Sequence, residues 1–174
     1  MARNIEIKAR VADLDALAAR TAAIADSGPV EIPQDDTFFG CDNGRLKLRA
    51  FEDGRGELIF YRRPDTDGPK VSSYVLSPTD SPDTLREALT LANGQAGRVV
   101  KHRTLFLVGR TRVHLDRVQG LGDFMELEVV LADGESPEDG VREAHALMAR
   151  LGIAQDALVT GAYHDLLRAR AAAD

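Results

Sequence analysis

Cysteine is almost absent from this chain of 174 residues, in which Cys41 is the only one. A single cysteine excludes an internal disulfide and a cysteine-rich zinc site, and it favours a reducing compartment. No segment approaches the roughly 18 consecutive apolar residues that a membrane-spanning helix requires. Residues 1–6 also lack the apolar stretch of a signal peptide. We therefore expect a cytoplasmic protein without a membrane partner.

An excess of positive charge is missing as well, because 28 acidic residues outnumber 22 basic ones and the net charge is −6. This balance argues against broad, non-specific binding of nucleic acid. The basic residues nevertheless gather in particular segments, above all in residues 42–70. This segment contains Arg45, Lys47, Arg49, Arg55, Arg62, Arg63 and Lys70.

Hydrophobic periodicity predicts an α+β chain. Strands are expected at 2–11, 35–41, 45–51, 57–63, 70–77, 98–108, 110–117 and 123–131. Helices are expected at 12–25, 81–93, 137–151 and 160–171, and Pro29 and Pro33 predict a turn region. Because no internal repeat or linker is visible, residues 1–174 are expected to form one domain. Its eight antiparallel strands would avoid bare edges by closing into a barrel, with the helices packed outside.

Charged residues recur with period two along several of these strands. Arg45, Lys47 and Arg49 alternate with leucines, and Glu126 and Glu128 alternate with apolar residues in the same way. In an antiparallel sheet such charges usually face water. Here, however, one strand carries only cations and another only carboxylates, and like charges along one face of a strand repel each other. This pattern favours faces that bind a ligand of opposite charge, such as a polyanion over the cations.

A closed barrel would place these charged faces inside and the apolar faces outside, beneath the helices. A lumen with basic walls and a carboxylate cluster would cost free energy if it had no partner. It is well matched to a triphosphate held by Arg and Lys, with Mg²⁺ or Mn²⁺ bridging to carboxylates. The sequence therefore predicts a small-molecule triphosphate as substrate and a divalent metal ion as cofactor.

An ordered set of short motifs resembles the CYTH superfamily, also called triphosphate tunnel metalloenzymes. That superfamily includes class IV adenylate cyclases, thiamine triphosphatases and inorganic triphosphatases. The matching segments are 4–8 (NIEIK), 36–39 (DTFF), 44–49 (GRLKLR), 101–103 (KHR), 113–116 (VHLD), 120–124 (GLGDF), 126–128 (ELE) and 162–167 (AYHDLL). Within the superfamily, residues 114–116 and the Gly-Leu-Gly segment are most similar to the class IV cyclases.

The resemblance implies an eight-stranded triphosphate tunnel and assigns roles to particular residues. The implied metal ligands are Glu6, Asp116, Glu126 and Glu128. The implied phosphate contacts are Lys8, Arg45, Lys47, Arg49, Arg63, Lys70, Lys101, Arg103 and Arg112. One residue departs from the family pattern, since Asn4 stands at the first glutamate of the Glu-x-Glu-x-Lys motif and brings no negative charge.

Lys8, His114 and Asp116 are the candidate catalytic residues. His114 shares a strand face with Asp116, and histidine commonly serves as an acid–base group. Cys41 is interpreted as a small apolar residue rather than a nucleophile. The remaining histidines, the phenylalanines of the DTFF segment and Tyr163 are expected to lie on the surface or to pack.

Three functions fit this pattern. The first is a class IV adenylate cyclase-like enzyme that converts ATP to cyclic AMP and pyrophosphate. The second is hydrolysis of inorganic, thiamine or nucleoside triphosphate in the same tunnel. The third is an organic-phosphate-binding protein, or an enzyme of specialised metabolism, whose metal site is weakened at Asn4. The sequence leaves the organic part of the substrate and a homodimer open.

Overall fold

Eight strands and four α-helices make up the chain, and the computed structural model describes all of residues 1–174. The strands are β1 (Ala2–Arg10), β2 (Ser27–Phe39), β3 (Arg45–Ala50), β4 (Gly56–Arg62), β5 (Lys70–Thr79), β6 (Gln95–Val108), β7 (Thr111–Val118) and β8 (Gly122–Val130). The helices are α1 (Leu14–Ala22), α2 (Pro82–Asn93), α3 (Pro137–Arg150) and α4 (Tyr163–Ala173), with a short 3₁₀ helix, η1, at Gln155–Ala157. No helix combines the length and the apolar character that crossing a membrane would take.

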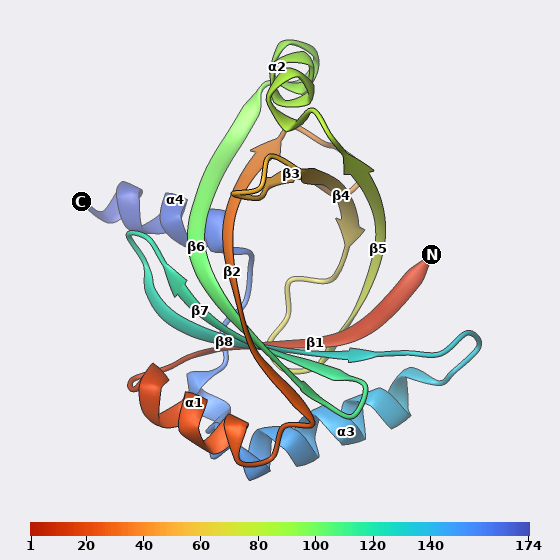
Figure 1. The fold of residues 1–174 in the computed structure, drawn as a ribbon, viewed down its shortest axis with the longest axis vertical. Coiled ribbons are helices and arrows are strands. Elements are labelled where there is room, and N and C mark those ends of the chain that lie inside the picture. The colour runs from red at the N-terminus through yellow and green to blue at the C-terminus, as the bar shows by residue number, and fades with distance from the viewer.

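The strands form one closed antiparallel barrel in the order β1-β5-β4-β3-β2-β6-β7-β8. β1 closes the ring because it pairs with β5 on one side and with β8 on the other. Figure 1 shows α1 and α3 against the outer face of β1, β7 and β8, with α2 at the opposite end of the ring. The predicted α+β class and the eight-stranded closed barrel are therefore confirmed.

Side chains of β1 show how the alternating sequence divides inside from outside. Ile5 and Ile7 are fully buried in a core cluster of 16 residues, where they meet α1 and α3. Glu6 and Lys8, on the other face, line the interior of the barrel. Gly140 fits this packing, because a Cβ atom at that position of α3 would come within 2.6 Å of the Ile5 side chain.

The predicted turn at Pro29 and Pro33 is wrong, because β2 includes both prolines, although its pairing with β6 shifts register between Ser27 and Val30. β3 pairs with β2 only from Asp35 to Phe39, so the first half of β2 has β6 as its one partner strand. Proline lacks the N–H that a second partner would require and is tolerated on such an edge.

Two other predicted boundaries shift by a few residues. α1 begins at Leu14 rather than at residue 12, since the Asp13 side chain caps it by accepting a hydrogen bond from the Ala16 amide at 2.9 Å. α4 begins at Tyr163 rather than at residue 160, and the Ala162 amide donates to the Asp165 carboxylate at 2.9 Å. This late start matters for the site, because it turns Tyr163 toward the barrel interior.

Candidate functional site

The barrel encloses a cavity of about 310 Å³. Basic side chains of β3 and carboxylates of β8 share it, since Lys47, Arg49, Glu126 and Glu128 all line its wall. The other charged lining residues are Glu6, Lys8, Asp36, Glu57, Arg63, Lys101, Arg103 and Arg112. The central expectation from the sequence, that the ionic faces of the strands converge on one channel, is therefore confirmed.

The basic pair on β3 is held by a carboxylate that the sequence analysis did not single out. Asp36 on β2 accepts hydrogen bonds from Lys47 at 2.8 Å and from Arg49 at 2.8 Å through both of its oxygens. Although burial opposes it, the charges of Arg49 and Lys47 keep the pKa of Asp36 well below its ordinary value. Asp36 therefore fixes two cations on the cavity wall. The strand register, in which Asp36 faces Arg49, is the signal that identifies it.

A second ionic cluster joins β6 to β7. Arg103 binds both oxygens of Asp116, at 2.7 and 2.6 Å, and reaches Glu126 at 2.9 Å. Lys101 lies 3.3 Å from Asp116, and the Tyr163 hydroxyl donates to the same carboxylate at 2.8 Å. Asp116 is fully buried beneath these donors. The structure thus places it as the anchor of Arg103, and its roles in metal binding and catalysis stay predictions.

Lys8 sits between the cavity and the start of α4. Its ammonium lies 3.2 Å from Glu126, donates to the Gly161 carbonyl at 3.1 Å and rests 4.0 Å from the centre of the Tyr163 ring. Tyr163 therefore lines the barrel interior at this end, beyond the packing role that the sequence predicts. Arg63 also bonds to the Gly161 carbonyl, at 2.9 Å, and forms an ion pair with Glu6.

Two of the predicted phosphate contacts, Arg45 and Lys70, are not among the residues that line the cavity. Arg45 pairs with Asp65 at 3.0 Å and with Asp165 at 2.7 Å, which ties β3 to α4. Lys70 donates to the Thr66 carbonyl at 2.8 Å, and burial followed by the charge of Arg63 lowers its pKa to about 8. Contact of these two residues with phosphate stays a prediction.

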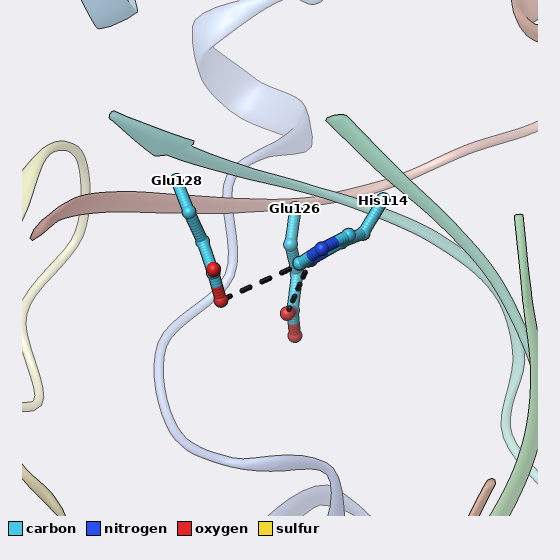
Figure 2. Close-up of side chains that lie close together, drawn as sticks. All are labelled: His114, Glu126 and Glu128. Carbon is cyan, nitrogen blue, oxygen red and sulfur yellow. Dashed lines mark ion pairs between the residues drawn. The ribbon is translucent and has the colours of Figure 1, made fainter. Parts of the chain in front are cut away.

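One group of side chains has the composition and spacing of a metal site. Figure 2 shows His114 from β7 directed toward Glu126 and Glu128 from β8. Nδ1 of His114 lies 3.9 Å from Glu126 and 3.8 Å from Glu128, and one ligand atom from each residue falls within 4.8 Å of the others. Glu6 and Asp116, the other predicted ligands, are not members of this group.

The surroundings of the group are cationic. Arg112 holds Glu128 at 2.8 Å, while Lys8 and Arg103 hold Glu126. Burial, and then the charge of Arg103, lowers the pKa of His114 below its ordinary value. The imidazole is therefore neutral at physiological pH and has a nitrogen lone pair to offer.

An apolar wall faces this charged one, and the sequence analysis did not identify it. Ile59 and Tyr61 on β4 and Tyr74 and Leu76 on β5 line the cavity. Alternation along these strands places the side chains between them on the outer face, as for Val75. Because both faces of β4 and β5 carry apolar residues, the sequence alone offers no means to choose which face lines the channel.

Asn4 lies in the lining as well, buried at 3% exposure, and its side-chain oxygen has no hydrogen-bond partner. It faces Ser72 across the β1–β5 pair. The position where the family pattern has a glutamate is thus inside the channel, and its side chain brings an uncharged amide to the wall.

A family model of the CYTH domain matches residues 2–163 of this chain. The chain belongs to the CYTH family. Among curated proteins, the adenylate cyclase CyaB of Aeromonas hydrophila is 26% identical over 171 residues, which cover 94% of this chain and 87% of that protein. CYTH proteins are enzymes of the adenylate cyclase-like or triphosphatase type. This chain has their fold and contains a candidate metal-binding group.

Solved structures share the same fold. The PH1012 protein of Pyrococcus horikoshii superposes with a TM-score of 0.84 at 21% identity, covering 94% of this chain and 99% of that one. HpAC1 of Hippeastrum, a protein with a dominant triphosphatase activity, superposes with a TM-score of 0.67 at 17% identity, covering 96% of each chain. At these identities the likeness concerns the fold.

Proposed function

We propose that this CYTH protein converts ATP to cyclic AMP and pyrophosphate with the help of a divalent metal ion. One observation carries the proposal: a single cavity inside the barrel joins an array of cations and a His-Glu-Glu group to an apolar wall. The cations suit a polyphosphate, and the apolar wall suits a flat organic base. The cyclase name of the Aeromonas hydrophila relative supports ATP as the substrate.

The phosphates would lie against the cations of β3 and β6, where Lys47, Arg49, Lys101 and Arg103 line the cavity. Two of these, Arg49 and Arg103, are held by two hydrogen bonds to a buried carboxylate each, so their positions are set before a ligand arrives. Such preorganised charge stabilises a leaving group without reorganisation at the moment of reaction. A bound divalent ion would supply further charge stabilisation at the phosphate oxygens.

In the proposed reaction the ribose 3′-oxygen forms a bond to the α-phosphorus. The bond from that phosphorus to the bridging oxygen breaks, pyrophosphate leaves with the electron pair, and the hydroxyl proton passes to solvent. Lys8, beside Glu126, and Arg63, which bonds to the Gly161 carbonyl, would neutralise negative charge of the phosphates at the end of the cavity nearest Tyr163. The apolar wall at Ile59 and Leu76 would orient the base.

Triphosphate hydrolysis is the second candidate, because the same array of cations in the cavity would hold a triphosphate whose terminal phosphorus is attacked by water instead of by a ribose hydroxyl. The triphosphatase activity of HpAC1 shows that a protein of this fold can favour such a reaction.

A substrate panel separates the two candidates. Purified protein would be given ATP, thiamine triphosphate or tripolyphosphate with Mg²⁺ or Mn²⁺, and cyclic AMP, pyrophosphate and phosphate would be measured together. Equal amounts of cyclic AMP and pyrophosphate from ATP support the cyclase. Phosphate without cyclic AMP at any pH overturns it in favour of hydrolysis.

Exchange of Asn4 tests the remaining alternative, a binding protein with a weakened metal site. If Asn4→Glu creates a triphosphatase activity that the natural protein lacks, the chain is a binding protein or has shifted its chemistry. A natural protein that already turns over any member of the panel rapidly rejects this alternative.

A further inference from the structure

His114 has a buried ring nitrogen with no partner in the protein. The residue is 5% exposed, and Nδ1 makes no hydrogen bond, although it is enclosed by protein. Its distances of 3.9 and 3.8 Å to the nearest oxygens of Glu126 and Glu128 are too long for hydrogen bonds. A buried polar atom without a partner costs free energy, so its persistence here calls for a ligand.

The two glutamates direct their remaining oxygens to the same place. Arg112 binds Oε2 of Glu128, which leaves Oε1 facing His114. Lys8 binds Oε1 of Glu126, while Oε2 faces both Arg103 and His114. The three ligand atoms lie within 4.8 Å of one another, a spacing that one ion can bridge with bonds of about 2.0–2.5 Å.

We infer that His114 is a metal ligand, and that Glu126, Glu128 and His114 select a first-row transition ion such as Mn²⁺ over Mg²⁺. Magnesium prefers an all-oxygen shell, whereas an imidazole nitrogen raises affinity for transition ions. Asn4 also disfavours Mg²⁺, because the cavity wall has a neutral amide where a carboxylate would attract a hard cation. The inference deepens the metal dependence of the proposed function and rests on it only for the ion's use in turnover.

This assignment changes the role of His114 within the site. A ring nitrogen committed to an ion cannot also carry a proton to or from the substrate. The acid–base role expected from the sequence is therefore replaced by ion selection. The neighbouring cations Lys8, Arg103 and Arg112 keep the two carboxylates close together until the ion arrives.

Metal binding to the purified full chain tests the inference without any turnover. Mn²⁺ would be titrated alone and against Mg²⁺, with bound Mn²⁺ followed by electron paramagnetic resonance. We expect Mn²⁺ to bind about tenfold more tightly than Mg²⁺, because an imidazole ligand favours a transition ion and Mg²⁺ favours oxygen ligands. Spin-echo modulation from a directly bound ¹⁴N nucleus is the decisive signal for the imidazole.

The variant His114→Gln should lose the ¹⁴N modulation and most of the preference for Mn²⁺. His102→Gln is the matched control, because His102 lies on the surface beside Glu31. Glu128→Gln should weaken binding of both ions while it keeps the nitrogen signal. If His114→Gln fails to fold, the modulation in the natural protein alone decides the matter.

Two results would overturn the inference: bound Mn²⁺ without nitrogen modulation, or equal affinities for Mn²⁺ and Mg²⁺ in the natural protein. Neither result depends on catalysis. Failure of the proposed cyclase reaction would appear instead as absent cyclic AMP with intact, nitrogen-coordinated Mn²⁺. The two proposals can therefore fail separately.

Discussion

Two walls of the barrel differ in what lies behind them. The covered wall, formed by β1, β6, β7 and β8, has α1, α3 and α4 against its outer face. The open wall, formed by β4 and β5, has outer side chains such as Val75 that are half exposed. The covered wall carries the His-Glu-Glu group and the Arg103 cluster on its inner face, whereas the open wall presents mainly apolar and aromatic side chains to the cavity.

The difference suggests that the two walls have different functions. The His-Glu-Glu group and the Arg103 cluster lie on strands supported by the 16-residue core. Side chains that would contact the variable part of a substrate lie on strands with fewer packing constraints. Substitutions on the covered wall should therefore affect stability, and those on the open wall should affect substrate choice.

Removal of Arg103 is expected to have the largest effect. Arg103→Met leaves Asp116 and Glu126 buried without their main partner, and breaking a buried pair costs about 3–5 kcal/mol of unfolding free energy. Urea unfolding would measure the loss. The control Arg98→Met breaks an exposed pair with Asp35 and should cost at most about 1 kcal/mol. Similar losses in both variants would contradict the special position of the buried Arg103 cluster.

Truncation of apolar side chains compares the two walls directly. Leu127 is fully buried in the core behind β8, so Leu127→Ala should lower the unfolding free energy by about 2–5 kcal/mol. Val75→Ala, on the outer face of β5, should change it by about 0.5 kcal/mol or less. A comparable loss at Val75 would show that the open wall is covered in solution by something absent from this chain.

The sequence predicts the covered wall better than the open one, for a local reason. Period-two alternation in residues 4–8 or 126–128 places like residues on one face of a strand whatever the surroundings. Which charged side chains pair with each other depends on strand register, which no single strand contains. Two sets of ion pairs can therefore be identified only in the closed barrel: those of Asp36 with Lys47 and Arg49, and that of Asp116 with Arg103.

The inward face of the open wall cannot be predicted from the sequence, because both faces of β4 and β5 carry enough apolar residues to line the cavity. Leu58 and Phe60 could line the channel as well as Ile59 and Tyr61, and only the closed ring decides between them. The position of Tyr163 cannot be predicted for a similar reason. A tyrosine at the start of a helix can pack against the barrel or line its cavity, and only the folded structure shows that Tyr163 contacts Lys8 and Asp116.

The open wall should influence the choice of substrate. Leu76→Ser removes apolar surface from the cavity lining, so we expect the KM for ATP to rise about tenfold while that for tripolyphosphate stays unchanged. Val75→Ser is the matched control, since Val75 is equally exposed, at 49%, but points outward. An equal rise for both substrates would indicate that Leu76 supports the barrel rather than an organic group.

The last expected effect is a pH dependence centred on Lys101 of the covered wall. Burial, and then the charge of Arg103, lowers the pKa of Lys101 to about 7 from 10.5. As the pH rises through 7 the folded protein loses this proton while the unfolded chain keeps it, so stability should increase up to the unfolded pKa. Affinity for tripolyphosphate should change in the opposite direction, because the neutral amine no longer attracts phosphate.

Calorimetric titration with tripolyphosphate from about pH 7 to about pH 9 measures this change, which a single proton limits to about tenfold per pH unit. Buffers of different ionisation enthalpy should also reveal proton uptake on binding, since a bound polyanion raises the pKa of Lys101. Lys101→Met should remove both the uptake and most of the pH dependence. If the variant keeps them, another cation of the covered wall titrates in this range, and Lys101 holds its proton through its contact with Asp116.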